Sequence, residues 1–263
     1  MTVQARLPSS VLTSDVNQRI GRAMHKYDML RHGDRVLVAV SGGVDSLVLA
    51  WLLDSWRRKA PIDYELLAVH LDLGFSPAEK DCPVAIQLER LAVPYLNERT
   101  DFGARALAAE NGKSVCYHCS RQRRTRLFDL ARERKMTKIA FGHHKDDILE
   151  TFFLNLLYSG NISTMVPKQD LFGGSLSIIR PLAFIEKEEI FNIAASLDIK
   201  PMKNQCGLDG SSKRQEVRKM LSSLYQGNPK AKANIFAALG NIRHDYLLNT
   251  VSGANAVTDA NHP

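Results

Sequence analysis

Residues 41–46, with the sequence SGGVDS, stand between a β-branched apolar run and a segment of helix-forming residues. Two adjacent glycines allow the backbone to curl so that successive amides point at one anion. Two serine hydroxyls and the positive end of the following helix would add to this attraction. The pattern lacks the Gly-Lys-Ser/Thr ending of the nucleoside-triphosphatase P-loop, and it differs from Gly-x-Gly-x-x-Gly. It predicts a phosphate-binding turn made by Ser41, Gly42, Gly43, Asp45 and Ser46, rather than a simple helix cap.

A second pattern is the Cys-x-x-Cys pair of Cys116 and Cys119. Two thiolates at this spacing can close on one metal, and they favour zinc or an iron–sulfur cluster. Cys206, on a predicted loop, is the candidate third ligand, and His118 could complete a zinc site. Three cysteines without an evident fourth suit a [4Fe–4S] cluster with one open iron. Spacing alone leaves cluster, zinc and redox pair as alternatives, and it predicts that Cys82 is a spare thiol.

Four arginines follow the second cysteine within residues 121–126. If a helix begins near residue 120, Arg123 lies on the same face as Cys119. Most charge runs are solvated faces, but this one adjoins a predicted metal site. Guanidinium groups placed there could grip a nucleic-acid backbone or stabilise negative charge that grows in the site. We predict that Arg123 acts in catalysis and that Arg121, Arg124 and Arg126 bind nucleic acid.

A polar cluster at residues 143–147 joins the next predicted strand to a helix, so it should face the same crevice as the glycine turn. Its imidazoles and carboxylates could bind the adenine–ribose side of a nucleotide, order magnesium or move protons. Asp147 with Glu150 would also make a capping box. Asp72, at the end of the second strand, is a weaker candidate for the adenosine pocket or else a turn residue. The predicted residues of the cluster are His143, His144, Asp146 and Asp147.

The elements that must position these residues alternate between strand and helix. Apolar runs predict strands at 35–40, 65–70, 94–98, 138–141 and 176–180. Helical patterns are expected at 15–30 (capped by Ser14 or Asp15), from 47 beyond 53, and at 83–91, 121–135, 147–158, 187–197, 213–224 and 230–248. We therefore predict an α/β doubly wound, mainly parallel sheet with a helical C-terminal extension.

Composition limits the classes of function. The chain has 263 residues, a net charge of +7 and a pI near 9.3, which fits a polyanionic partner. No run of apolar residues is long enough for a membrane span, and the start does not resemble a secretion signal. Four cysteines do not make a disulfide scaffold, so a reducing cytoplasm is expected. We expect a leader and helix at 1–31, a nucleotide domain at 32–200, an extension carrying the third cysteine at 201–250 and a disordered tail at 251–263.

Together these motifs resemble the tRNA 2-thiocytidine synthetase family of PP-loop ATPases, over roughly residues 17–248. The matching stretches are SGGVDS (41–46), CYHCSRQRR (116–124), FGHHKDDILETFFLNLLYSG (141–160), IIRPL (178–182), QCG (205–207) and the block near 214–224. The resemblance implies ATP as substrate, Mg²⁺ held in part by Asp45, and a [4Fe–4S] cluster on Cys116, Cys119 and Cys206. It also implies adenylylation of the C2 oxygen of cytidine 32 in tRNA, followed by replacement of that oxygen with sulfur.

Further expectations follow from the resemblance. The catalytic residues would be Asp45, Arg123, Asp146 and Asp147, and the partners would be tRNA, a sulfur donor such as a cysteine desulfurase, and a second copy in a homodimer. Val44 departs from the family, which usually has lysine there, and Arg123 replaces a catalytic lysine of some relatives although arginine is a poor proton acceptor. The alternatives are a 2-thiouridine synthetase, a lysidine synthetase, and a non-catalytic nucleotide- and metal-binding module.

Overall fold

The structure is a computed structural model that describes residues 11–75, 82–109, 115–200, 202 and 213–248. The chain divides into two compact units, Met1–Val217 and Arg218–Pro263. The division falls inside helix α8 (Lys213–Gly227). The first unit contains the sheet and all the described residues of the predicted sites, and the second contains the rest of α8, helix α9 (Ala231–Ala238) and the 3₁₀ turn η2 (His244–Tyr246). The domain limits expected from the sequence stay a prediction.

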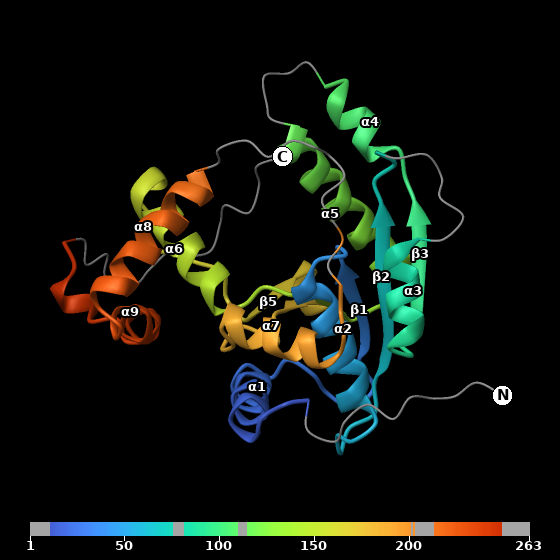
Figure 1. Ribbon diagram of the computed structural model, residues 1–263, viewed down its shortest axis with the longest axis horizontal. Coiled ribbons are helices and arrows are strands. Elements are labelled where there is room, and N and C mark those ends of the chain that lie inside the picture. The colour runs from blue at the N-terminus through green and yellow to red at the C-terminus, as the bar shows by residue number, and fades with distance from the viewer. Residues whose placement is uncertain (1–10, 76–81, 110–114, 201, 203–212, 249–263) are drawn as a thin grey trace. The chain divides into compact units, whose positions relative to one another are not determined.

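One six-stranded sheet organises the first unit, in the order β3-β2-β1-β4-β6-β5 (Figure 1). Every neighbouring pair is parallel except β5 with β6, which is antiparallel. The chain adds strands on one side of β1 up to β3 and then on the other side from β4 onward, so the loops after the neighbouring strands β1 and β4 lead in opposite directions. Open α/β sheets bind ligands in the crevice at such a point. The predicted doubly wound, mainly parallel sheet is therefore confirmed. The strands are β1 (Arg35–Val40), β2 (Glu65–Asp72), β3 (Tyr95–Arg99), β4 (Lys138–Ala140), β5 (Lys168–Leu171) and β6 (Leu176–Ile179).

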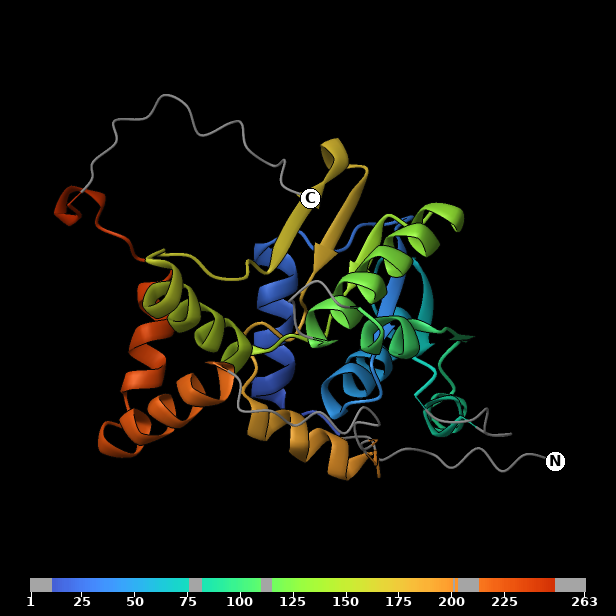
Figure 2. The ribbon, with the colours of Figure 1, turned by 90° about the horizontal axis from the view of Figure 1, so that it is seen from above.

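Helices cover both faces of this sheet (Figures 1 and 2). On one face, α2 is buried along most of its length and shares a core with α1, α3 and α7. On the other face, α5 packs Leu127, Leu130 and Ala131 against the strands. Such burial on both faces explains why the central strands are nearly continuous apolar runs. The helices of this unit before α8 are α1 (Ser14–Lys26), α2 (Val44–Arg57), α3 (Pro83–Arg90), α4 (Phe102–Leu107), α5 (Val115–Glu133), α6 (Lys145–Ser159) and α7 (Lys187–Ser196).

Several element boundaries differ from the sequence-based expectations. Thr13, not Ser14 or Asp15, caps α1, because its Oγ1 accepts the N–H of Val16 at 3.3 Å. Helix α5 already begins at Val115, so both cysteines lie on the helix rather than before it. Strand β5, the short helix α4 and the 3₁₀ turn η1 (Phe172–Gly174) were not predicted, and α9 is much shorter than expected.

Some expectations lie outside the part of the chain that the structure describes. These are the loop with Cys206 and the tail from residue 252. Within the described ranges, none of the helices combines the length and the apolar character needed to cross a bilayer.

Candidate active site

The SGGVDS segment forms a closed turn between β1 and α2. The Ser46 hydroxyl accepts the N–H of Ser41 at 3.1 Å and donates to the carbonyl oxygen of Gly43 at 2.8 Å. Gly43 is the N-cap of α2 and has no side chain, so within the described part of the chain no side-chain cap hydrogen bond satisfies the first amides of the helix. Uncapped amides at a helix N-terminus attract an anion. The turn therefore has the donors that a phosphate group requires.

Two glycines allow the close packing of this turn. Gly42 has φ +90°, and a Cβ there would lie 3.0 Å from Val84 Cγ2. Gly142, just after β4, supports the turn from the other side, since its Cβ would lie 3.0 Å from the backbone carbonyl of Asp45 and from the N–H of Ser46. Any side chain at Gly142 would push against the start of α2. The loops after β1 and β4 are thus in direct contact, as the sheet order predicts.

The side chain of Asp45 contacts Lys187, a residue that the sequence analysis did not assign to the site. Lys187 Nζ lies 2.6 Å from Asp45 Oδ1 and 2.7 Å from Oδ2. The backbone N–H of Lys187 also donates to Asp146 Oδ2 at 3.0 Å, which holds the start of α7 against the start of α6. No local pattern could have indicated the pair, because its members lie 142 positions apart.

His144 is the centre of the predicted polar cluster. Its side chain is only 6% exposed, and three carboxylates surround it. Nε2 lies 3.3 Å from Asp147 Oδ2 and 3.8 Å from Asp45 Oδ1, and Nδ1 lies 3.6 Å from Asp146 Oδ2. The backbone N–H of His144 donates to Asp147 at 3.0 Å, so these two residues form the capping box of α6. The expected box of Asp147 with Glu150 is wrong, because the helix begins two residues earlier than predicted.

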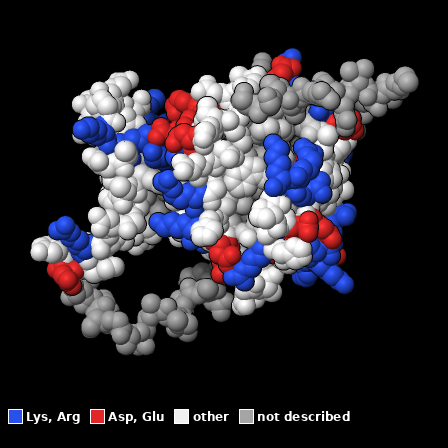
Figure 3. All heavy atoms as spheres, turned by 90° about the horizontal axis from the view of Figure 1, so that it is seen from below, with Lys and Arg blue, Asp and Glu red and all other residues white. Residues whose placement is uncertain are grey.

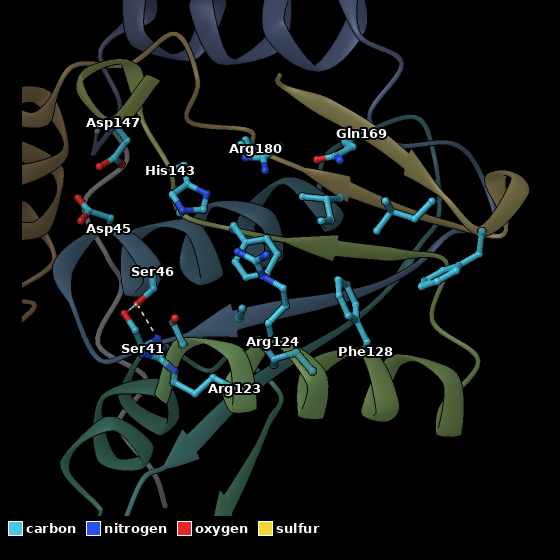
Figure 4. Close-up of a pocket in the computed structure, with 18 residues that line it drawn as sticks. Ser41, Asp45, Ser46, Arg123, Arg124, Phe128, His143, Asp147, Gln169 and Arg180 are labelled. Atoms are coloured by element: carbon cyan, nitrogen blue, oxygen red, sulfur yellow. Dashed lines mark hydrogen bonds between the residues drawn. The ribbon is translucent and has the colours of Figure 1, made fainter. Parts of the chain in front are cut away.

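His143 points into the site beside this cluster (Figure 4). Burial lowers the pKa of His143 to about 4, although the carboxylate of Asp147 partly opposes the change. The positive charges of Arg180 and Arg214 add to the lowering of the pKa. The imidazole is therefore neutral at neutral pH. Its buried Nδ1 has no hydrogen-bond partner among the described residues.

A cavity of about 650 Å³ connects the phosphate turn with α5 and the β5–β6 hairpin. In Figure 4, the serines of the turn lie at one end, Phe128 and Gln169 lie toward the other, and Arg124 reaches between them from α5. Of the residues predicted for the site, the cavity is lined by Ser41, Asp45, Ser46, Arg123, Arg124, His143 and Asp147. Lining residues that the sequence analysis did not assign include Ser120, Phe128, Gln169, Phe172 and Arg180. Arg180 stands in the IIRPL stretch, so the motif that carried the resemblance could have indicated it.

Asp72 does not line this cavity. Its Oδ1 accepts the N–H of Gly74 at 2.9 Å, and its Oδ2 lies 2.9 Å from Arg99 Nη1. Gly74 has φ +73°, which the turn requires. The contacts of Asp72 are therefore those of the turn residue that the sequence offered as the alternative.

The two described cysteines of the predicted metal site lie one helical turn apart on α5. Cys116 is exposed and Cys119 is partly buried, and neither belongs to a disulfide. Residues three apart share a helix face, so both sulfurs can reach one ligand. Cys206 lies outside the described residues, and within those residues no group of three potential ligands surrounds one point. Arg123, one helical turn after Cys119, lines the cavity. Burial lowers the pKa of Arg123, and the charge of Cys119 raises it.

The predicted nucleic-acid arginines divide into two kinds. Arg126 forms ion pairs with Glu98 and Glu133, at 2.8 Å for the closest contact to Glu133, so its charge is already neutralised. The pKa of Glu98 is lowered by the hydrogen bond from Arg126. Arg121 and Arg124, in contrast, are exposed, and Arg124 also lines the cavity. Lys and Arg side chains gather in several groups on the face shown in Figure 3.

Comparisons with known proteins support this picture. Residues 12–224 match the family described as the PP-loop domain. A tRNA-cytidine(32) 2-sulfurtransferase of Anaeromyxobacter dehalogenans is 39% identical over 86% of this chain and 79% of its own length. The enzyme of that name from Geobacter sulfurreducens is 34% identical over 89% of this chain and 92% of its own.

A solved structure shares the fold at lower identity. The U34-tRNA thiolase NcsA from Methanococcus maripaludis, with its [4Fe-4S] cluster, superposes with a TM-score of 0.69 at 23% identity, covering 86% of this chain and 78% of that one. At this identity the likeness concerns the fold alone. The length and identity of the sequence matches are what decide membership: the chain belongs to the PP-loop domain family and, within it, to the tRNA-cytidine(32) 2-sulfurtransferases.

Proposed function

We propose that this chain uses ATP to replace the C2 oxygen of cytidine 32 in tRNA with sulfur. The observation that carries the proposal is one cavity lined both by the phosphate turn and by the helix that bears Cys116 and Cys119. The names of the relatives favour cytidine over the uridine and lysidine alternatives. A non-catalytic module would not need an activating nucleotide and a thiol pair beside each other.

The phosphate turn would hold the pyrophosphate part of ATP. Its uncapped amides and the Ser41 hydroxyl supply donors, and the macrodipole of α2 adds positive charge. Asp45 and Asp147 approach the same edge of His144, at 3.8 and 3.3 Å, so their oxygens face one region. Carboxylate oxygens of this kind suit Mg²⁺, which would offset the charge of the phosphates. The remaining roles of Asp72, His143 and Asp146 in nucleotide binding stay predictions.

The first chemical step is attack of the C2 oxygen on the α-phosphorus, with pyrophosphate leaving. A carbonyl oxygen carries no proton, so this step requires no general base. Arg123 can therefore contribute as a fixed positive charge, which is what a guanidinium does best. Preorganised positive charge stabilises the developing negative charge on the phosphate more than freely reorienting water would.

Cys116, Cys119 and Cys206 would hold a [4Fe–4S] cluster. The two described thiols fit this role, because they are reduced, accessible from solvent and one helical turn apart. When bound, the cluster would supply the sulfur-binding position for replacing the activated oxygen, which leaves with AMP. The sulfur donor, a homodimer and a cytoplasmic location belong to this proposal through the resemblance, and Arg121 and Arg124 are its candidates for contact with tRNA.

Nucleoside mass spectrometry of tRNA from a deletion strain tests the function. We expect loss of 2-thiocytidine, restored by the wild-type gene and not by a Cys206→Ser gene. A Cys82→Ser gene is the matched control, since Cys82 lies on a different segment from the proposed ligands. Loss of 2-thiouridine instead would move the target base, and unchanged 2-thiocytidine would refute the proposal. Release of AMP and pyrophosphate on addition of tRNA separates the enzyme from a binding module.

A further inference from the structure

The end of the cavity away from the phosphate turn is aromatic and basic. It is bounded by the β5–β6 hairpin and by the middle of α5. The sheet order places β5 three strands from β1, which is roughly 14 Å at the usual spacing between strands. A second ligand can therefore occupy this end while ATP phosphates occupy the turn. The lining residues here are Arg124, Phe128, Gln169, Leu171, Phe172, Ile178 and Arg180.

Phe172, at the tip of the hairpin, has two features that packing alone does not explain. It is 71% exposed, and its φ of +50° lies in the left-handed region that bulky residues avoid. Its ring meets Phe128 edge to face, with centroids 6.2 Å apart and an interplanar angle of 88°. This contact uses little of the ring surface. An exposed aromatic face at the mouth of a cavity is suited to stacking against a nucleobase.

Arg180, directly after β6, is a buried cation for which the described residues provide no carboxylate partner. It is 7% exposed, and its Nη1 donates to the backbone oxygen of Val166. Its buried Nε has no hydrogen-bond partner among the described residues. Burial, followed by repulsion from Arg124, lowers the pKa of Arg180 to about 10. A buried guanidinium that lacks a counter-charge is suited to an anionic ligand.

The charges of the cavity are separated along its length. The acidic lining residues, Asp45 and Asp147, both lie at the end with the phosphate turn, while Arg124 and Arg180 repel each other toward the hairpin. Figure 4 shows Arg180 and Gln169 directed into the cavity from the hairpin, opposite α5. An anion bound between the two arginines would relieve their repulsion. The same ligand could place a flat group against Phe172.

We propose that Phe172, Arg124 and Arg180 form a subsite for one nucleotide of the RNA substrate. The base stacks on the Phe172 ring, and its phosphate lies between the two guanidinium groups. The assignment rests on the proposed function, because it takes the substrate to be RNA and the other end of the cavity to take ATP. It explains how one nucleotide extruded from an RNA loop is held in the same cavity as the ATP phosphates.

Binding of an anticodon stem–loop RNA with cytidine at position 32 tests the role of Phe172. The full-length protein with its cluster is titrated into labelled RNA, and fluorescence anisotropy gives the dissociation constant. We expect Phe172→Leu to weaken binding about tenfold, since loss of one base–aromatic stack has this size. Phe172→Trp should bind like the wild type. Tyr95→Leu, which removes a partly buried ring from the strand at the opposite edge of the sheet, is the matched control.

The salt dependence of RNA binding tests Arg180. Arg180→Gln removes the charge and keeps a shorter polar side chain. We expect the slope of log K against log salt concentration to fall by about 0.7, the value for one phosphate contact to a single strand. Affinity for a non-hydrolysable ATP analogue, measured by calorimetry, should stay at the wild-type value in both variants. An unchanged ATP affinity also shows that each variant is folded.

Three results would overturn the subsite. The first is an unchanged RNA affinity in Phe172→Leu, and the second is an unchanged salt slope in Arg180→Gln. The third is a loss of ATP affinity in either variant while RNA binding stays intact, because the anion bound by the arginines would then be a phosphate of ATP. These results differ from failure of the proposed function, in which the wild-type protein itself would not form 2-thiocytidine. A wild-type protein that thiolates tRNA while Phe172→Leu binds RNA normally would refute only the subsite.

Discussion

Replacing Gly142 with alanine should disturb the phosphate turn without removing any group from it. The added Cβ would lie 3.0 Å from the backbone carbonyl carbon and oxygen of Asp45 and from the nitrogen of Ser46. Comfortable contacts of a methyl group lie near 3.5–4.0 Å. The start of α2 must therefore move by about 0.5 Å, or strand β4 must move away from it. Because the displaced amides are those proposed to bind pyrophosphate, the strain should appear in the affinity for ATP.

The size of the effect follows from the cost of overpacking, which is about 1–3 kcal/mol at a well-packed site. If the strain falls on the turn, about 2 kcal/mol corresponds to an ATP dissociation constant raised roughly 30-fold. If it falls on the fold, the free energy of unfolding drops by a similar amount. Titration calorimetry with a non-hydrolysable ATP analogue and urea denaturation measure the two effects separately.

Gly21→Ala is the matched control. Gly21 lies inside α1, and its Cβ would meet only Trp56, at an ordinary distance of 3.7 Å. Alanine within a helix stabilises by about 0.5–1 kcal/mol relative to glycine, so this variant should unfold at higher urea and bind ATP normally. If Gly142→Ala matched the wild type in both ATP affinity and stability, the close contact between the two loops would affect neither, and the proposed dependence of the phosphate turn on Gly142 would be refuted.

Four further predictions concern the cations, thiols and imidazole of the site. Lys187→Met should raise the affinity for Mg²⁺ in the absence of ATP about fivefold, because Asp45 then loses the cation that competes with the metal. This factor is the scale of a partly exposed ion pair. Titration with Mn²⁺, followed by electron paramagnetic resonance, measures the affinity, and an unchanged value would show that the ion pair does not affect metal binding. Cys119→Ser should abolish the iron and sulfide bound after anaerobic reconstitution, whereas Cys82→Ser should retain both. The free energy of unfolding should fall by about 3 kcal/mol as the pH drops from 6.5 through 4, because the His143 imidazole is protonated at a higher pH in the unfolded chain than in the folded one. Urea titrations at several pH values measure this loss, which should be absent from His143→Gln. Arg126→Gln should lower stability and leave the salt slope of RNA binding unchanged, since that guanidinium pairs with Glu98; a reduced slope would show that it contacts phosphate.

Local patterns predicted the central elements well. The β1 run and the glycines after it are neighbours in sequence, so their strand–turn–helix geometry could be read directly. Strand β5 was missed because its four residues, KQDL, are mostly polar and lie at an edge, where no alternation is needed. Helix α5 was predicted to begin too late, because the polar stretch around the cysteines lacks an apolar helical repeat.

The contacts that define the site were harder to predict. The pairing of Lys187 with Asp45 and of Arg126 with Glu98 depends on where distant helices and strands meet. Composition could show an excess of arginine, but it could not separate a guanidinium that is neutralised by glutamate, such as Arg126, from a buried one such as Arg180, whose pKa is lowered by burial and by Arg124. The distinction between structural and ligand-binding arginines therefore required coordinates.

The phosphate turn depends on chain made much later in synthesis. Asp45 meets Lys187 across 142 positions, and the carbonyl oxygen of Gly42 accepts the N–H of Met202 at 3.1 Å. A ribosome has to extend the polypeptide well past β6 before either contact can form. A product terminated before Lys187 would carry the SGGVDS sequence but lack the residues that hold it in place, so the ATP site can mature only after Met202 has been synthesised.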